Sequence, residues 1–221
     1  MSKAEKKNNK GKKNILYFIA KFILHVIWLV FPYKIVGREN LYTDDPVLIS
    51  CNHISYMDPV FIVMAMKKRR KIYFLAKSEI FKNKFISGFF RFCGAIPIDR
   101  KNGIQGIRSA VDKLESGNVV GIFPEGTRSK TGKLGKPKSG IIMVAQRCKS
   151  DIIPVTLVTK HQKVRPFRKT VIYVGERIEY EKLGIDSASS ISQLKAAGEL
   201  IFEDTRRVLA QNTDVTGISE E

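Results

Sequence analysis

From residue 35 onward the sequence alternates between short strand-like runs and longer stretches with helical spacing. Runs rich in β-branched and aromatic residues occupy 46–50, 71–76, 118–123, 151–158 and 170–175. Apolar residues with helical spacing occupy 59–68, 85–92, 103–115, 140–148 and 191–210. This alternation predicts an α/β fold in which a sheet is covered by helices.

The length of 221 residues fits one domain with a short appended segment. We expect the α/β domain to cover residues 35–211. Residues 212–221 are mostly polar and predict a flexible C-terminal end.

The first 34 residues have a different composition. Residues 1–14 hold six lysines against one glutamate, which predicts a basic disordered tail. Residues 15–34 are strongly apolar but contain Lys21 and His25 on one helical face, so we expect a membrane-associated helix lying in one leaflet. A membrane-spanning helix and a helix packed on the protein's own core stay open. Bulky residues follow the segment, which disfavours a cleaved signal peptide.

The formal net charge of +18 requires an anionic partner, such as phospholipid headgroups, a phosphorylated metabolite or nucleic acid. Basic clusters at 67–71 and 160–169 would serve such a partner. Nucleic acid is disfavoured because exposed aromatic residues are not interleaved with the basic ones. The three cysteines are widely spaced and form no disulfide or zinc pattern, which favours a reducing cytoplasmic environment.

The segment SCNHISYMDP, residues 50–59, places His53 and Asp58 five residues apart at the end of an apolar run. Histidine exchanges a proton near neutral pH, and a carboxylate on its second ring nitrogen fixes the tautomer. Asp58 followed by Pro59 is also typical of a helix N-cap. The pair is therefore a candidate general base with its orienting acid, and Asp58 could do both jobs.

Two further segments carry polar residues in expected loops. The segment GAIPIDRKN, residues 94–102, ends an apolar stretch with Asp99 and Arg100. The segment FPEGTRSKTG, residues 123–132, follows a strand and exposes Thr127, Arg128 and Ser129. Loops after the strands of an α/β sheet bind ligands, and arginine suits phosphate because its planar fork donates two hydrogen bonds.

Two catalytic patterns fail on spacing. GTRSKTGKL resembles a phosphate-binding P-loop, but its second glycine comes late and Leu134 occupies the position of the metal-binding serine or threonine. No G-x-S-x-G nucleophile elbow is present, so Ser50 and Ser129 are poor nucleophile candidates. His53 would therefore have to activate a substrate directly.

The blocks NHISYMD, GAIPIDR, FPEGTRS and IIPVTL, in that order over residues 50–157, closely resemble those of the lysophospholipid and glycerophosphate acyltransferase family. The resemblance implies a mixed sheet flanked by helices. It also implies acyl transfer at the cytoplasmic face of an anionic membrane. The acyl group would move from acyl-CoA or acyl carrier protein to the sn-2 hydroxyl of lysophosphatidic acid or a related lysophospholipid, without a metal or cofactor.

In this family His53 would be the general base and Asp58 its orienter. The resemblance assigns a substrate-binding role to six further residues, namely Lys77, Arg100, Glu125, Gly126, Thr127 and Arg128. One departure concerns the acyl groove, because bulky Ile141 and Ile142 follow Gly140 where the family often has a small residue. A membrane lipid-binding protein without catalytic activity stays the alternative.

Overall fold

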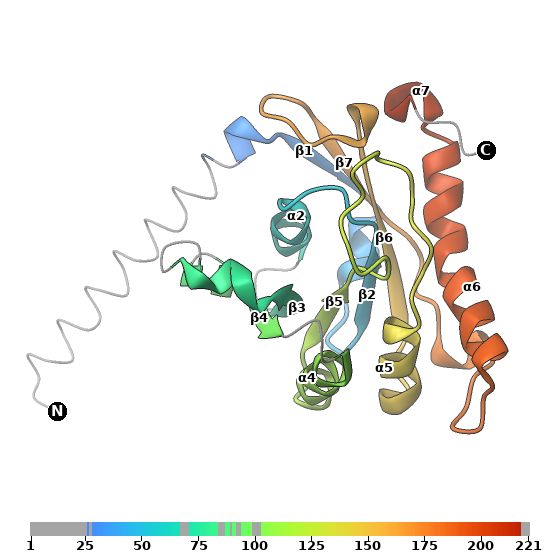
Figure 1. Cartoon of the computed structure of the whole chain (residues 1–221). Coiled ribbons are helices and arrows are strands. Elements are labelled where there is room, and N and C mark those ends of the chain that lie inside the picture. Colours follow the sequence, from blue (N-terminus) through green and yellow to red (C-terminus); the bar gives the residue numbers. More distant parts are fainter. Residues whose placement is uncertain are drawn as a thin grey trace, which may run out of the picture.

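The computed structural model describes residue 26 and residues 28–66, 71–83, 87–88, 90–91, 94–98 and 103–217. The described chain forms a seven-stranded sheet with helices on both faces (Figure 1). The order of its strands is β1 (Tyr33–Val36), β7 (Thr170–Val174), β6 (Ile152–Thr159), β2 (Leu48–Cys51), β5 (Val119–Ile122), β3 (Ile72–Lys77) and β4 (Ala95–Ile98). Among the described strands, β6 and β7 are the only antiparallel pair, so the sheet is mixed, as expected.

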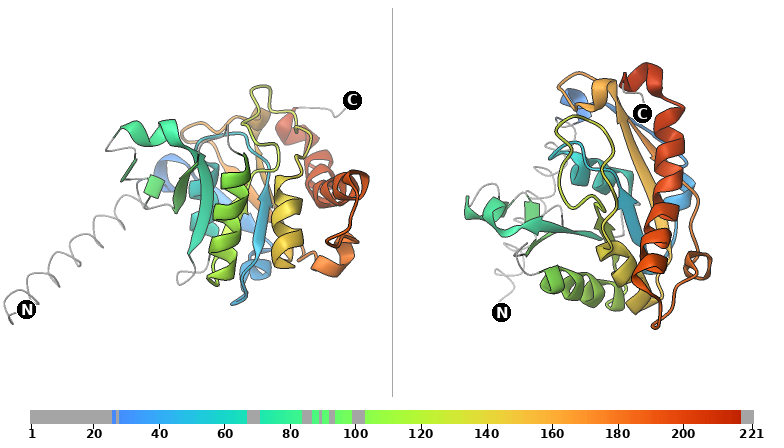
Figure 2. Two further views of the ribbon diagram at one scale, coloured as in Figure 1. Left: turned by 60° about the horizontal axis from the view of Figure 1, so that its bottom comes forward. Right: turned by 45° about the vertical axis from the view of Figure 1, so that its right-hand side comes forward.

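Two helical layers cover the sheet. Helix α2 (Asp58–Ala65) lies on one face, while α4 (Gly103–Glu115), α5 (Gly140–Cys148) and α6 (Ile191–Ala210) lie on the other (Figure 2). Short 3₁₀ segments η1 (Arg38–Leu41), η2 (Ser78–Lys82), η3 (Lys160–Gln162) and η4 (Tyr180–Leu183) and the terminal helix α7 (Thr213–Thr216) complete the described elements. The bounds of α4, α5 and α6 match the prediction.

The alternation of side chains along β2 explains the two cores. Ile49 and Cys51 pack in the apolar cluster beneath α2, together with Phe61. Leu48 points to the opposite face and packs with residues of α4, α5 and α6. Both faces of a central strand are therefore apolar, as in sheets covered on both sides.

Three details differ from the sequence prediction. Strand β4 lies within residues 94–102, which were expected to form a loop, and β1 begins at Tyr33, inside the expected apolar helix. Helix α2 ends at Ala65, before the predicted residue 68, because Met66 is extended. The expected flexibility of 212–221 stays a prediction, although residues 213–216 form α7.

Most of the expected N-terminal helix falls outside the described residues, as do the basic residues 67–70, Asp99 and Arg100. The expected helix at 85–92 is described only at residues 87–88 and 90–91, which are helical. Within the described ranges, no helix combines the length and apolar character needed to cross a membrane.

Candidate functional site

The loop that follows β2 is held by a buried amide. Asn52 Nδ2 donates to the carbonyl of Leu157 at 3.0 Å, and Asn52 Oδ1 accepts from the N–H of Leu157 at 2.8 Å. Because β2 and β6 run parallel, these bonds extend their pairing beyond the last strand residue. The chain turns away from the sheet immediately after Asn52 and presents His53 at the carboxyl edge.

His53 and Asp58 form the expected pair. His53 Nδ1 lies 2.7 Å from Asp58 Oδ2, and the side chains are 13% and 0% exposed respectively. A carboxylate at this distance accepts the Nδ1 hydrogen, which leaves the lone pair on Nε2. The imidazole is therefore held in the tautomer that a general base requires.

Asp58 also organises the loop before its helix. Its Oδ2 accepts from the N–H groups of Ile54 and Ser55, both at 2.7 Å, whereas its buried Oδ1 has no hydrogen-bond partner among the described residues. Burial raises the pKa of Asp58 above its ordinary value, and the hydrogen bonds from His53, Ser55 and Ile54 act against that rise.

The predicted N-cap role of Asp58 was wrong. Helix α2 begins at Asp58, and Met57 occupies the cap position without a side-chain hydrogen bond to the helix. Pro59 still lies in the first turn, where its missing N–H leaves no intrahelical bond unmade. The Asp58 carboxylate instead accepts hydrogen bonds from the preceding loop and from His53.

Aromatic rings form one wall of the site. The imidazole of His53 stacks on Phe123, with ring centroids 4.2 Å apart, and Phe123 stacks on Phe74 at 5.8 Å. Gly121 makes this possible, because a Cβ there would lie 2.2 Å from the Phe74 ring. The imidazole is thus fixed by a carboxylate at one nitrogen and by an aromatic face.

Glu125 ties two loops together. Its Oε1 accepts from the N–H of His53 at 2.7 Å, and its Oε2 accepts from the N–H of Gly135 at 2.9 Å. The side chain is buried, which raises its pKa despite these two hydrogen bonds. Ser129 N–H also donates to the carbonyl of His53 at 2.8 Å, so the FPEGTRS segment holds the main chain of the histidine on both sides.

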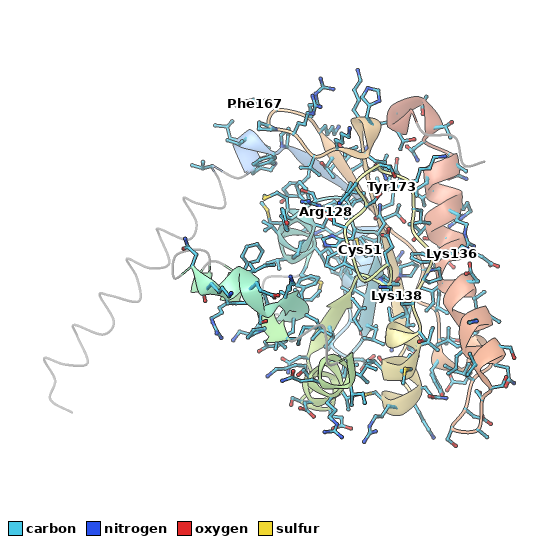
Figure 3. The ribbon with its side chains drawn as sticks, in the orientation of Figure 1. Cys51, Arg128, Lys136, Lys138, Phe167 and Tyr173 are labelled. Carbon is cyan, nitrogen blue, oxygen red and sulfur yellow. The ribbon has the colours of Figure 1, made fainter. Side chains whose placement is uncertain are left out.

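The remaining residues of that segment surround the mouth of the site. Gly126 has φ +70°, and a Cβ there would approach Lys138 Nζ to 3.0 Å. The Arg128 guanidinium, labelled in Figure 3, lies over the Tyr56 ring, 4.0 Å from its centroid. Thr127 is exposed beside them. The sequence analysis did not single out Lys138, which lies two residues before α5.

A cavity of about 370 Å³ opens next to His53. It extends between β3, β4 and the first turns of α4 and α5, and its lining is mainly apolar, including Leu75, Ile98, Ile107, Ile122, Ile141 and Met143. Cationic groups, Lys77 and Lys138, also line it. The site therefore combines a histidine base, an apolar cavity and cationic groups beside them.

The structure brings most of the predicted site residues to this edge of the sheet. Lys77 lies at the end of β3 and pairs with Glu79, at 2.8 Å between Nζ and Oε1. Arg100 lies outside the described residues. Ile141 and Ile142, the bulky residues noted in the sequence, both belong to the core, and Ile141 also lines the cavity.

The arrangement suits base catalysis on a substrate with an apolar chain. His53 can accept a proton from a hydroxyl group, and the cationic groups suit an anionic substituent of the same molecule. Among the described residues, no group of three or more histidine, cysteine, aspartate or glutamate side chains is placed to hold a metal ion.

Comparison with known proteins gives a family match over residues 32–158, more than half of the chain, to the acyltransferase family. Curated relatives include the 1-acyl-sn-glycerol-3-phosphate acyltransferases of Bacillus subtilis and Streptococcus pneumoniae. The first is 34% identical over 122 residues, covering 55% of this chain and 60% of that protein. The second is 28% identical over 160 residues, covering 68% and 57%.

The chloroplastic LPAT1 of Arabidopsis thaliana, described with the same activity, is 31% identical over 152 residues, covering 66% of this chain and 42% of that protein. The chain thus spans about half the length of these curated relatives. Among solved structures, the 1-acyl-sn-glycerophosphate acyltransferase of Thermotoga maritima matches 97% of this chain and 85% of that one. Its TM-score is 0.70 at 23% identity, which shows a shared fold.

Proposed function

Since the chain belongs to the acyltransferase family, we propose that it is a 1-acylglycerol-3-phosphate O-acyltransferase. The acyl group moves from acyl-CoA or acyl carrier protein to the sn-2 hydroxyl of lysophosphatidic acid, and the product is phosphatidic acid. The curated relatives named above carry this activity in their descriptions, which supports the choice of acceptor. The observation that carries the proposal is the His53 and Asp58 pair beside the cavity.

The proposed reaction uses no covalent enzyme intermediate. His53 Nε2 takes the proton of the acceptor hydroxyl while its oxygen attacks the thioester carbonyl carbon. The carbon–sulfur bond then breaks, and the departing thiolate takes this proton from the His53 imidazolium. Asp58 stabilises the transient positive charge on the imidazole, as the aspartate does in a serine protease triad, with the substrate hydroxyl in place of serine.

The acceptor phosphate is proposed to lie at the loop that contains Gly126, Thr127 and Arg128. Arg128 suits a phosphate monoester because its guanidinium can donate two parallel hydrogen bonds while its face rests on Tyr56. Lys138, close above Gly126, adds a second charge, and Lys77 and Arg100 stay candidates for further contacts. The apolar cavity is the proposed site for an acyl chain.

The reaction is proposed to take place at the cytoplasmic face of a membrane. Both substrates carry acyl chains, and residues 15–34 are apolar enough for an interfacial helix. The net charge of +18 would hold the protein at anionic lipid and attract a phosphorylated or acidic acyl carrier.

The test is an assay of acyl transfer to lysophosphatidic acid by detergent-solubilised protein. The donors are palmitoyl-CoA, oleoyl-CoA and acylated acyl carrier protein. We expect phosphatidic acid from the unmutated chain and a loss of about 10²- to 10⁴-fold in kcat for His53→Ala. His161→Ala, at an exposed histidine of η3, is the matched control and should keep its activity.

Arg128→Ala tests the acceptor. It should raise the KM for lysophosphatidic acid and change the use of lysophosphatidylcholine, which has no phosphate monoester, much less. Preference for lysophosphatidylcholine over lysophosphatidic acid would instead assign another lysophospholipid as the acceptor. Lipid binding without acyl transfer to any acceptor would favour the alternative, a membrane lipid-binding protein without catalytic activity.

A further inference from the structure

The connection between β6 and β7 exposes a phenylalanine at its tip. Phe167 is 75% exposed, and its φ of 59° is unfavourable for a bulky side chain. A loop with a polar residue at this position would place less apolar surface in water. Such an exposed aromatic side chain on a strained tip indicates contact with something outside the chain.

The tip is fastened to the segment that precedes β1. The N–H of Phe167 donates to the carbonyl of Val30 at 2.6 Å, and the N–H of Thr170 donates to the carbonyl of Pro32 at 2.9 Å. Trp28 and Leu29, within one helical turn of Val30, are 46% and 62% exposed. Apolar side chains from two distant parts of the sequence therefore lie together at this end of the molecule, where Figure 3 labels Phe167.

Positive charge surrounds the same tip. Between Asp151 and Glu176 the sequence contains no acidic residue. The exposed cations of the loop are Lys163, Arg165, Arg168 and Lys169. An apolar group ringed by cations fits the interface of an anionic bilayer, where the phenyl ring enters the acyl boundary and the cations stay with the headgroups.

We propose that the loop 163–169 is a membrane-docking element that inserts Phe167 into an anionic lipid surface beside the exposed side chains of Trp28 and Leu29. A lipid partner is favoured over an acidic protein because the sequence of residues 15–33, which includes Trp28 and Val30, is mostly apolar. The element would give the protein a second contact with the bilayer and so restrict its orientation there. The inference rests on the proposed membrane location but does not require acyl transfer.

The experiment exploits the single tryptophan of the chain, Trp28. In the full chain, Trp28→Phe combined with Phe167→Trp places the only indole at the loop tip. The matched control combines Trp28→Phe with Ile191→Trp, because Ile191 is 74% exposed at the start of α6, at the opposite end of the molecule in Figures 1 and 2. Each protein is mixed with vesicles of phosphatidylcholine alone or with phosphatidylglycerol, containing brominated acyl chains as quenchers.

We expect quenching and a blue shift of the indole at position 167 only with phosphatidylglycerol, and neither change at position 191. Phe167→Asp, with Ile191→Asp as its control, should weaken sedimentation with phosphatidylglycerol vesicles by about tenfold. Arg168→Glu should also weaken it, by about fivefold or more. Equal quenching at the two positions, or quenching at 167 that does not depend on anionic lipid, would overturn the proposal.

Binding of acyl carrier protein that shifts the indole at 167 without lipid would favour an acidic protein partner and would also overturn it. No acyl acceptor is present in the vesicle assay. Failure of lipid docking and failure of acyl transfer are therefore separate results.

Discussion

The main-chain N–H of His53 donates to Glu125 Oε1 at 2.7 Å, across 72 residues of sequence. With Oε2 bound to the N–H of Gly135, both carboxylate oxygens hold main chain of the protein. This geometry favours a positioning role for Glu125, whereas the family resemblance suggested contact with substrate. The two roles differ in what a mutation would change.

Glu125→Gln should reduce kcat by about 10- to 100-fold while the KM for the acceptor changes little. A glutamine can accept only one of the two N–H groups and turns its own NH₂ toward the other, so the backbone of His53 shifts. The unfolding free energy should fall by about 1 to 3 kcal/mol at neutral pH. Steady-state kinetics and urea unfolding measure both effects. A rise in KM at unchanged kcat would instead assign Glu125 to substrate binding.

The stability of the protein should depend on pH through the same carboxyl group. Burial raises the pKa of Glu125 above its ordinary value of 4.5. The carboxyl group of Glu125 therefore stays protonated in the folded chain at a pH where it has lost its proton in the unfolded chain. The part of the stability that comes from this pKa shift is therefore fully present below pH 4.5 and is lost as the pH rises through the raised pKa. Compared with Glu125→Gln, the stability advantage of the unmutated protein should shrink over this window.

Urea unfolding of both proteins at several pH values measures this difference. Glu203→Gln, at an exposed position of α6, is the matched control for the loss of one carboxylate. An advantage that grows as the pH rises would contradict the predicted direction of the Glu125 pKa shift.

Asp58→Asn should separate the charge of Asp58 from its geometry. All three donors, on His53, Ile54 and Ser55, bind Oδ2, and Oδ1 has no partner in the part of the chain that the structure describes. Asparagine can place its carbonyl oxygen at Oδ2 and its amide nitrogen at Oδ1, so the loop and the tautomer are kept. The negative charge that stabilises the imidazolium is lost, and kcat should fall by about 10²-fold or more.

Circular dichroism and urea unfolding would show whether the loop is kept, and Asp58→Ala, which removes all three bonds, should be much less stable. If Asp58→Asn retained full activity, the charge of Asp58 would have no part in the reaction.

The sequence predicted the inner strands and the three long helices well, because strongly periodic, buried segments carry a clear pattern. It missed the strands at the two edges of the sheet. The two edge strands, β1 and β4, have four residues each. Strand β4 also contains Pro97, which lacks an N–H and is tolerated at an edge strand, where one side of the backbone is not paired with another strand. Short edge strands depend on pairing with a neighbour, which local sequence does not reveal.

The candidate site shows the same division. The His53 and Asp58 pair could be predicted because the two residues lie only five positions apart, at the two ends of one short loop. The stacking of His53 on Phe123 and the bond from His53 N–H to Glu125 join segments that are about 70 residues apart in the sequence. The second contact uses a main-chain donor that every residue except proline has. Only the three-dimensional arrangement of β2 and β5 reveals these contacts.

Gly106→Ala should shift the preferred acyl donor to shorter chains. Gly106 lines the cavity on α4, and a Cβ there would lie 3.3 Å from Ile98 Cδ1 and 3.6 Å from Leu75 Cδ1. The helix itself should gain up to about 1 kcal/mol, since alanine is the better helix former, so folding is kept while the cavity narrows.

The measurement is kcat/KM over a series of acyl-CoA chain lengths. Gly198→Ala, inside α6 with its nearest neighbours at 3.8 Å, is the matched control and should leave the chain-length profile unchanged. If Gly106→Ala also left the profile unchanged, the donor acyl chain would not lie beside Gly106, and the cavity would have to hold another part of the substrates.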